Sequence, residues 1–365
     1  MQSARQLYRA NSAHIVFVTG TPTSVREGSG TYVGICALRD ALIASGVDVM
    51  LVAPGEQQLS AIGRLWFNYR ARTNSQLRRS NVVVGFDLDG VFIAAHDALD
   101  VACVKGVIAE ELRFEKGLQR LSLLLQSYFE KRRVRNADRV LTTSHYAAEA
   151  VEKHYGVPAE QICIVPELID LGRWQTALQQ ANRESRSEAS ILCVDHLYRR
   201  KDVATLLRAM ARVQSPAVLR IVGVGPELAR LRRLSRKLHI EDRVKFLEHL
   251  SFAQLAQEYR SADIFCFPSR QEGFGIVLLE AMAAGLPIVA SQTSAIPETV
   301  LDRQCGLLVE PGDFAGFAAA MDELLQSPIT RQRLGRAGLQ RVALYDAPLV
   351  AHQFLAALGI NPGAS

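Results

Sequence analysis

The feature that most constrains this chain is an alternation of short apolar runs with longer amphipathic stretches, repeated along nearly its whole length. The runs are continuously apolar and rich in Val, Ile and Leu, which is typical of strands buried on both faces of a parallel sheet. They are HIVFVTG, VDVMLVAP, NVVVGFD, VACVKG, RVLTTS and QICIVPE in the first half, and ILCVDH, VLRIVGVG, RVKFLEH, DIFCFPS, LPIVAS and GLLVE in the second. Helical spacing occurs over residues 31–45, 113–136, 202–213, 226–239, 252–261, 275–284, 314–325 and 331–342. Strands that alternate with helices predict an α/β fold with doubly wound parallel sheets.

Two such series are present, and the polar stretch between them, residues 173–189, is the predicted linker. The length agrees, since 365 residues at ~150 per domain make about two domains. We therefore predict two Rossmann-like domains facing a cleft, residues 1–172 and 190–345, with ligands bound at the carboxyl ends of the strands. Residues 346–365 form the end of the chain, where a helix over 347–358 could cross back to the first domain.

The composition excludes several classes of protein. With 48% apolar and 22% charged residues the chain is typical of globular proteins and not of disordered ones. It has no run of eighteen uncharged apolar residues and no signal-peptide core near its start, which argues against a membrane-spanning protein. The six cysteines lack metal-ligand spacing, and three lie in apolar, strand-like runs, which predicts reduced thiols in a cytoplasmic protein. The net charge of +5 fits an anionic ligand or surface, but the basic clusters are too dispersed to predict nucleic-acid binding.

The most informative segment is SRQEGFGIVLLEAMAAGLPIVAS, residues 269–291. A strand ends before it, and a helix begins near Gly275, where Gly273 also leaves no side chain over the helix start. Outward amides and the positive end of the helix dipole make this a ready site for a phosphate or diphosphate. Glu272 and Glu280 flank that site, which suits a ligand with hydroxyl groups on both sides of a diphosphate, such as a nucleotide sugar. Taken singly, each glutamate is equally well explained as a dipole-stabilising or surface acid.

The stretch EGFGIVLLEAMAAGLPIVAS resembles the E-x7-E signature of family 4 glycosyltransferases, which are retaining enzymes of the two-Rossmann GT-B fold. The resemblance extends over about residues 14–345, and this C-terminal motif is its more specific part. It implies that Glu280 holds the ribose hydroxyls and that Glu272 holds the hydroxyls of the transferred sugar. It also implies contacts to the donor sugar and diphosphate from the helix start, at Gly273, Phe274, Gly275, Ile276 and Val277.

A basic cluster, LYRRKD at residues 197–202, follows the strand run ILCVDH. Positive charge at the carboxyl end of a strand can neutralise a leaving diphosphate, although a solvated basic helix start is the commoner explanation. By the resemblance, Lys201 matches the family lysine that grips the diphosphate. The family's Gly-Arg reads Asp195-His196 here, so Arg200 or, more weakly, His196 takes the place of the arginine, or the phosphate grip differs.

Glycines and one leucine complete the predicted donor site. Gly223 and Gly225 end a strand before a helix, which indicates either close approach to a nucleotide or simply a tight turn. By the resemblance, Leu250 follows the strand whose end contacts the base, and Gly30 lies in the loop that closes over the donor. The first glycine-rich turn lacks the GxGxxG spacing directly after a strand, which argues against a nicotinamide cofactor.

The first series carries three charged residues of interest. Lys105 stands where many family members have a histidine near the donor sugar, and it could supply positive charge to the departing phosphate. Asp87 and Asp89, in GFDLDG, could orient or deprotonate an acceptor hydroxyl, although a surface turn explains them equally well. They are also the only candidate metal ligands. In the GT-B fold a helix start and Lys or Arg usually replace the metal, so the resemblance implies metal independence and no cofactor.

We therefore predict a transferase that moves a hexose from a UDP- or GDP-linked sugar to a hydroxyl acceptor (a glycan, a lipid-linked sugar or a small metabolite), with retention. The predicted catalytic residues are Glu272 and Lys201, which the resemblance implies, and Lys105, which could supply positive charge. Because no Ser/His/Asp or Cys/His constellation is visible, we expect catalysis mainly through electrostatics. The alternatives are a GT-B nucleotide-sugar epimerase and a non-catalytic sugar-nucleotide-binding protein, which Asp195-His196 favours. The two-carboxylate scheme of glycoside hydrolases fits poorly, because one of the two glutamates lies within the helix.

Two basic stretches bear on the acceptor. Residues 59–80 mix three aromatic residues with five arginines, and residues 118–135 are apolar along one stripe and basic at the end. Such segments could lie on an anionic membrane, as a peripheral contact, or hold an extended acceptor. The second stretch is more simply explained as a packed helix whose terminal positive charges suit its dipole.

Overall fold

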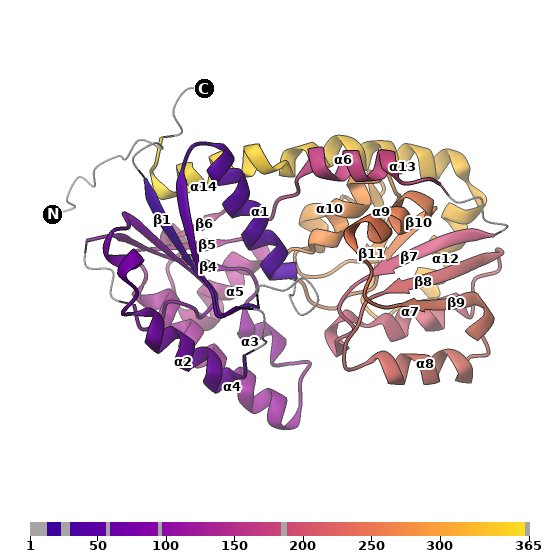
Figure 1. Ribbon diagram of the computed structural model, residues 1–365. Helices are drawn as coiled ribbons and strands as arrows, with labels where there is room; N and C mark the ends of the chain where they lie inside the picture. The colour runs from indigo at the N-terminus through magenta and orange to yellow at the C-terminus, as the bar shows by residue number, and fades with distance from the viewer. Residues whose placement is uncertain (1–12, 23–29, 56–58, 94–96, 184–187, 362–365) are drawn as a thin grey trace. The chain divides into compact units, whose positions relative to one another are not determined.

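The computed structural model describes residues 13–22, 30–55, 59–93, 97–183 and 188–361. The chain divides into two compact units, one formed by residues 1–168 with 347–365 and the other by residues 169–346. Each unit contains a six-stranded sheet flanked by helices (Figure 1). All strand pairings within the two sheets are parallel, which confirms the predicted α/β fold.

The sheet of the first unit has the strand order β2-β1-β3-β4-β5-β6. Its strands are β1 (His14–Val18), β2 (Asp48–Val52), β3 (Val82–Phe86), β4 (Leu99–Val104), β5 (Arg139–Thr142) and β6 (Ile162–Ile164). The helices of this unit are α1 (Gly30–Ala44), α2 (Ala61–Ala71), α3 (Ile108–Glu111), α4 (Gly117–Asn136), α5 (His145–Tyr155) and α14 (Ala347–Leu358). Every residue of β3 is buried, as expected for an inner strand of a sheet that is covered on both faces.

The last helix, α14, belongs to the first unit although it follows the second unit in sequence. Its Phe354 meets Phe17 of β1 edge-on, with 6.0 Å between ring centroids. Phe17 meets Phe86 of β3 in the same manner at 5.0 Å. Val350 and Leu355 are also fully buried, so α14 packs its apolar stripe against the first sheet and ties the end of the chain to it.

The sheet of the second unit has the strand order β12-β11-β10-β7-β8-β9. Its strands are β7 (Ala189–Val194), β8 (Ala217–Val222), β9 (Val244–Leu247), β10 (Ile264–Phe267), β11 (Ile288–Ser291) and β12 (Gly306–Val309). Its helices are α6 (Leu171–Gln180), α7 (Val203–Met210), α8 (Leu228–Lys237), α9 (Phe252–Ser261), α10 (Ile276–Ala283), α11 (Ile296–Thr299), α12 (Phe314–Gln326) and α13 (Pro328–Val342). All four residues of β10 are buried at the centre of this sheet.

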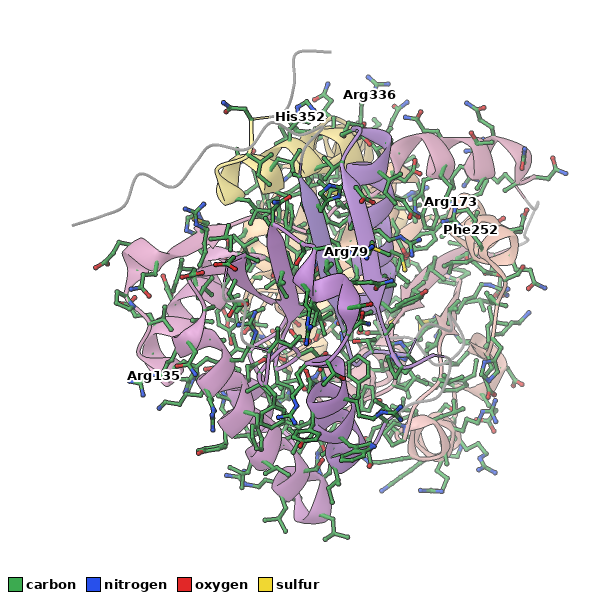
Figure 2. The ribbon with its side chains drawn as sticks, turned by 60° about the vertical axis from the view of Figure 1, so that its left-hand side comes forward. Arg79, Arg135, Arg173, Phe252, Arg336 and His352 are labelled. Carbon is green, nitrogen blue, oxygen red and sulfur yellow. The ribbon has the colours of Figure 1, made fainter. Side chains whose placement is uncertain are left out.

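The predicted linker is wrong over residues 173–180, because helix α6 occupies this first part and packs as a part of the second unit. Trp174 is buried and meets Phe252 of α9 edge-on at 5.0 Å. The guanidinium group of Arg173 lies 4.2 Å from the centroid of the same Phe252 ring (Figure 2). The polar residues that suggested a linker are the exposed side of an amphipathic helix. Residues 184–187 of the stretch lie outside the described residues.

The site is positioned by the carboxyl ends of β7, β8 and β10, which are neighbours or next neighbours in the second sheet. The register pairs Val194 with Val222, the last residues of β7 and β8, so the two strands end level with each other. Loops that follow such strands gather along one edge of a parallel sheet. The loops concerned are residues 195–202, 223–227 and 268–275, and they contain most of the predicted donor-binding residues.

Candidate active site

Helix α10 begins where the sequence predicts, and its cap has to be a glycine. Gly275 caps the helix with a φ of 93°, in the left-handed region. A Cβ atom there would lie 3.1 Å from Cδ1 of Leu278 and 3.3 Å from Cε1 of Phe267, so a larger residue would be both strained and crowded. The preceding Phe274 is buried and packs edge-on against Tyr345, with 5.5 Å between centroids. The helix start, with its outward amides, is therefore held firmly at the sheet edge.

Lys201 lies at the centre of a buried cluster with two carboxylates. Its Nζ is 2.5 Å from Oε1 of Glu272 and 2.9 Å from Oδ1 of Asp195. The side chains of Lys201, Glu272 and Asp195 are only 10%, 8% and 5% exposed. Asp195 directly follows β7, Lys201 ends a short 3-10 helix over 199–201, and Glu272 lies in the loop between β10 and α10. The structure thus joins Lys201 and Glu272, and it adds Asp195, which sequence reasoning noted only as a departure from the family pattern.

The loops around this cluster are bonded to one another. The amide of Arg270 donates to the carbonyl of Arg200 at 2.8 Å, and Nε of Arg270 donates to Oδ2 of Asp202 at 2.6 Å. The Arg200 guanidinium group lies 6.0 Å from the centroid of the Tyr198 ring. The ring of His196 is 6.2 Å from the same aromatic ring. Both candidates for the missing family arginine are therefore grouped around Tyr198.

The cluster holds one positive and two negative groups when all three are ionised. Burial raises the pKa of Asp195 to about 6, although Lys201 opposes this shift. Burial by itself lowers the pKa of Lys201, but the two carboxylates outweigh it and hold that pKa above its usual value. Within the described part of the chain, Oδ2 of Asp195 is buried and has no hydrogen-bond partner. The lysine therefore stays charged, and Asp195 is the member of the cluster suited to gain a proton.

Glu280, the second glutamate of the signature, is bonded to a tyrosine that sequence reasoning missed. Oη of Tyr259, in α9, donates to Oε2 of Glu280 at 2.7 Å. Burial raises the pKa of Glu280 to about 7, and the tyrosine hydrogen bond partly counteracts it. The Tyr259 ring stacks on Phe265 of β10, with 5.7 Å between centroids. A carboxylate has two oxygens with several lone pairs, so Glu280 held in this way can still accept hydrogen bonds from ligand hydroxyls.

Close packing between loops explains Gly223 and Gly225. A Cβ at Gly223, whose φ is 143°, would lie 1.8 Å from the carbonyl oxygen of Asp195, and one at Gly225 would lie 2.7 Å from the backbone of Leu197. The tight-turn explanation is therefore sufficient for both glycines. Leu250 is half-buried against the core of the second unit, just before α9. In the first unit, Gly30 is the exposed first residue of α1. Donor contacts at these four positions stay predictions, as they do at Gly273, Ile276 and Val277, which are partly exposed at the start of α10.

Lys105 of the first unit also has a buried carboxylate partner. Its Nζ is 2.9 Å from Oε2 of Glu167, and the two side chains are 7% and 5% exposed. Burial alone lowers the pKa of Lys105, but Glu167 holds it above its usual value. The backbone amide of Lys105 donates to Oδ1 of Asp87 at 2.9 Å, and burial raises the pKa of Asp87 to about 6. Glu167 was missed, although it is the acid that ends the run QICIVPE, just after the strand, and could have been placed at the same sheet edge.

The structure corrects the prediction for Asp89, which is completely buried and bonded through both oxygens. Arg64 donates to Oδ1 and Oδ2 at 2.9 and 2.6 Å, and Nδ2 of Asn68 donates to Oδ1 at 2.8 Å. The amide of Gly20, after β1, donates to Oδ2 at 2.5 Å. Asp89 therefore holds α2 against the end of β1 and is not available to an acceptor hydroxyl or, with Asp87, to a metal ion.

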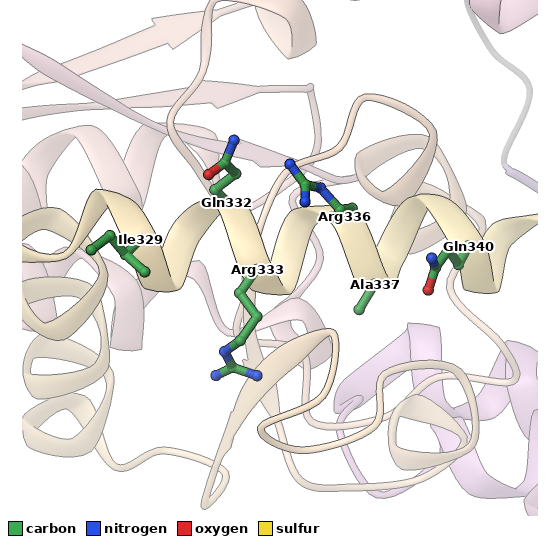
Figure 3. A pocket seen from close by; sticks show the side chains of 6 residues that line it. All are labelled: Ile329, Gln332, Arg333, Arg336, Ala337 and Gln340. Atoms are coloured by element: carbon green, nitrogen blue, oxygen red, sulfur yellow. The ribbon is translucent and has the colours of Figure 1, made fainter.

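Other features of the described residues lie apart from this chemistry. These residues include no group of three His, Cys, Asp or Glu side chains that could hold a metal ion, and all six cysteines are free thiols. A surface hollow along one face of α13 shares no residue with the predicted site (Figure 3). Its lining consists of Ile329, Gln332, Arg333, Arg336, Ala337 and Gln340. No helix in the described ranges is long and apolar enough to cross a membrane.

Comparison with known proteins matches the chain to glycosyltransferase families. Residues 175–341 match the family model described as glycosyl transferases group 1, and residues 91–173 match the one described as Glycosyltransferase Family 4. Glycogen synthase of Mycobacterium tuberculosis is 31% identical over 261 residues, which are 69% of this chain and 62% of that protein. D-inositol 3-phosphate glycosyltransferase of Segniliparus rotundus is 30% identical over 274 residues, 72% of this chain and 59% of that protein. The chain thus spans about three fifths of the length of these curated relatives.

Solved structures with the same architecture define the class of fold. Sucrose-phosphate synthase from Thermosynechococcus elongatus aligns with a TM-score of 0.81 at 22% identity, covering 95% of this chain and 98% of that one. Anabaena HepE in complex with UDP-glucose aligns with a TM-score of 0.72 at 18% identity, covering 94% of this chain and 99% of that one. The fold is that of the GT-B proteins. The chain belongs to the group 1 glycosyltransferases of family 4, which confirms the family that the E-x7-E signature indicated.

Proposed function

We propose that this protein transfers a hexose from a nucleoside-diphosphate sugar to a hydroxyl acceptor, with retention of configuration and without a metal ion. The observation that carries the proposal is the buried cation Lys201, bonded to Glu272 in the loop that leads into the start of α10. A fixed cation and a helix start at one sheet edge are the groups that a leaving diphosphate requires. Because they supply positive charge themselves, we propose that a metal ion is not needed for that role.

Each residue then has a distinct task. Lys201 and the first-turn amides of α10 stabilise the negative charge that develops on the diphosphate as the bond to the sugar breaks. Glu272 accepts hydrogen bonds from hydroxyls of the hexose, and Glu280, set in place by Tyr259, accepts them from the ribose. The acceptor hydroxyl attacks the same face that the diphosphate leaves. Asp87, whose pKa burial raises to about 6, is the candidate that takes the acceptor proton.

The relatives narrow the donor and acceptor classes only broadly. HepE, which shares the fold, is named in complex with UDP-glucose, and this favours trying UDP-hexoses first. Relatives named as glycogen synthase, D-inositol 3-phosphate glycosyltransferase and MMP alpha-(1->4)-mannosyltransferase favour a sugar or polyol hydroxyl as the acceptor. The donor sugar is left open between UDP- and GDP-linked hexoses.

One observation favours a second candidate, a protein that binds sugar nucleotides without turnover. Asp195 adds a negative charge beside Lys201, and His196 stands where the family has an arginine, so the site is less positive than the family pattern implies. Weaker attraction for a diphosphate lowers both donor affinity and stabilisation of the leaving group. Both candidate functions predict that the protein binds a sugar nucleotide, but only the transferase predicts that it turns the donor over.

The test is a donor panel read by two measurements. Calorimetry with UDP-, GDP- and ADP-hexoses identifies the bound donor, and release of the nucleoside diphosphate, with and without glycan, polyol and sugar-phosphate acceptors, measures turnover. We expect the protein to bind one donor class and to release the nucleoside diphosphate only when an acceptor is present. This release should continue in EDTA, and NMR should show that the product keeps the anomeric configuration of the donor. Binding with no release supports the non-catalytic candidate, and binding of none of the donors contradicts both.

A further inference from the structure

The outer side of α4 carries apolar side chains where a packed helix would carry polar ones. Leu118, Leu121 and Tyr128 are 85%, 62% and 62% exposed, and Leu124 and Leu125 are exposed beside them. Spacings of three and four residues place these side chains along one stripe over about three turns of the helix. This arrangement corrects the explanation of residues 118–135 as a packed helix for the first part of α4 only, because Glu130, Arg133 and Val134 near its end are buried. A stripe of this size on the surface of one helix is unusual for a protein face that meets only water.

Helix α2 extends the same surface with aromatic side chains. Ile62, Trp66 and Tyr69 are exposed at spacings of four and three residues, and α2 contacts α4 within the first unit (Figure 1). An unbroken series of ring contacts joins the two helices, from Trp66 to Tyr69, Phe92, Phe129 and Tyr128, with centroid separations of 5.7, 6.4, 5.8 and 5.3 Å. We call this surface the α2–α4 face; its residues are Ile62, Trp66, Tyr69, Leu118, Leu121, Leu124, Leu125 and Tyr128.

The exposed charges that α2 and α4 themselves carry are of one sign. The two helices contain a single carboxylate, Glu130, and it is completely buried. The cations at the exposed positions of α2 and α4, or one residue beyond either end, are Arg70, Arg72, Lys116, Arg120, Arg132 and Arg135. Arg135, near the C-terminal end of α4 (Figure 2), is exposed, and its Nη2 would lie 3.5 Å from a Cβ atom at Gly156. The face therefore combines apolar, aromatic and cationic groups without an exposed acid on either helix.

We propose that the α2–α4 face docks the protein on the surface of an anionic lipid bilayer, with the apolar stripe at the level of the headgroups. Tryptophan and tyrosine prefer this interface because their rings are amphipathic, and flanking arginines are attracted to anionic headgroups. A second copy of the chain is a less suitable occupant, since two such faces would bring arginines of like charge together. The inference does not depend on the proposed transferase activity, because it rests on a surface apart from the predicted donor site.

The protein contains a natural reporter for this proposal. It has two tryptophans, of which Trp66 is 60% exposed on the face and Trp174 is buried in the second unit. The full-length protein is titrated with vesicles of phosphatidylcholine and phosphatidylglycerol in equal parts, or of phosphatidylcholine alone. We expect a blue shift of Trp66 emission, and quenching by brominated lipid, with the anionic vesicles only. The shift should weaken as salt is raised, and Trp66→Phe should abolish it.

Variants separate the apolar from the charged contribution. Leu121→Gln with Tyr128→Gln should reduce vesicle co-sedimentation at least about tenfold, because losing the burial of even one large apolar side chain costs that much in a partition constant. Arg132→Ser with Arg135→Ser should remove the preference for anionic vesicles. The matched control is Ile329→Gln with Leu339→Gln, which changes two exposed apolar residues of α13 and should leave binding unchanged. Circular dichroism and urea unfolding confirm that each variant is folded.

Three outcomes would overturn the proposal. The first is the absence of an emission shift on anionic vesicles, and the second is equal loss of binding in the α13 control. The third is a dimer in light scattering that dissociates in Leu121→Gln with Tyr128→Gln, because that result assigns the α2–α4 face to a second copy of the chain. A failed donor panel leaves all of these measurements intact, so the two proposals can fail separately.

Discussion

Each unit buries a lysine at the carboxyl edge of its sheet, but the two lysines differ in the balance of charge around them. Lys105 has one close carboxylate partner, Glu167, and the pair is neutral. Lys201 has two, Asp195 and Glu272, so that cluster carries an excess of negative charge when all three groups are ionised. Both lysines are nearly inaccessible to water. The main difference between them is therefore the number of carboxylates bonded to each, and not their exposure.

The difference indicates which cluster is suited to exchange partners. A buried ion pair that is neutral and fully hydrogen-bonded is stabilised little by a ligand. Removing one of its members costs much free energy, because the other charge is left unpaired. The Lys201 cluster has a surplus carboxylate with a buried oxygen that lacks a partner in the described residues. If a diphosphate takes one of the contacts of Lys201, Asp195 can accept a proton in exchange. The second unit thus has the more adaptable arrangement, and five experiments test this view.

Removal of Lys201 should have the largest effect. Lys201→Met leaves two buried carboxylates without a cation, so we expect the free energy of unfolding to fall by about 3 kcal/mol. Donor turnover should fall at least about 100-fold because the leaving diphosphate loses its cation. Urea unfolding and nucleotide release measure the two effects, with Lys201→Arg as the charge-conserving control. Parental turnover in a folded Lys201→Met would remove the basis of the proposed site.

Removal of Lys105 tests whether its ion pair with Glu167 only stabilises the fold or also takes part in catalysis. Lys105→Met should lower the free energy of unfolding by about 3 kcal/mol, and adding Glu167→Gln should restore much of it, because no buried charge is then left unpaired. Urea unfolding measures both variants. The predicted catalytic role of Lys105 requires that the restored double variant still turn over its donor poorly. Full turnover in that variant would make Lys105 a structural residue.

Glu280 and Glu272 should affect different parts of the donor, the nucleotide and the sugar respectively. Glu280→Ala should weaken binding of both UDP and UDP-glucose about tenfold, since hydrogen bonds to a charged group are worth ~1.5–3 kcal/mol and water replaces part of them. Glu272→Ala should weaken UDP-glucose and slow turnover while leaving UDP affinity nearly unchanged. Calorimetry with the two ligands separates these outcomes. An equal loss for both ligands in the Glu272 variant would contradict its assignment to the sugar.

The smallest effect should be a pH dependence from Asp195. Its pKa of about 6 means that it is protonated near pH 5 and ionised near pH 7, where it competes with a diphosphate for Lys201. From this group we expect UDP-glucose to bind about threefold to tenfold more weakly near pH 7 than near pH 5. Asp195→Asn should lose that contribution, and calorimetry at both pH values measures it. Glu280 titrates in both proteins, so the difference between them isolates Asp195.

The same shift makes a prediction about stability. The pKa of Asp195 rises from 3.8 to about 6 on folding, so the folded state binds the proton more tightly than the unfolded state does. The contribution of this group to the free energy of unfolding therefore falls as the pH rises through that window. Urea unfolding at several pH values should show that the parent loses this contribution as the pH rises and that Asp195→Asn does not. A parallel pH dependence in the two proteins would mean that Asp195 does not titrate in this way.

Local patterns predicted the regular elements well because they depend on neighbouring residues. Helices over 252–261 and 347–358 are observed with the predicted bounds, and Ser251 with Gln254 forms a capping box that marks the start of the first. The apolar runs all became parallel strands, since unbroken apolar segments need cover on both faces. The polar composition of residues 173–189 led to the prediction of a linker where the structure has helix α6. The buried Trp174 was the signal from which this helix could have been predicted.

The sequence by itself determined the α/β architecture, the glycine at the start of α10 and the family, because periodicity, turn chemistry and the E-x7-E spacing are local properties of the chain. Only the tertiary structure decided which charges meet: Lys105 with Glu167, Lys201 with Asp195 and Glu272, and Asp89 with Arg64. It also decided that the apolar stripe of α4 faces outward. Burial and pairing act through space between residues far apart in sequence, so no local pattern contains them.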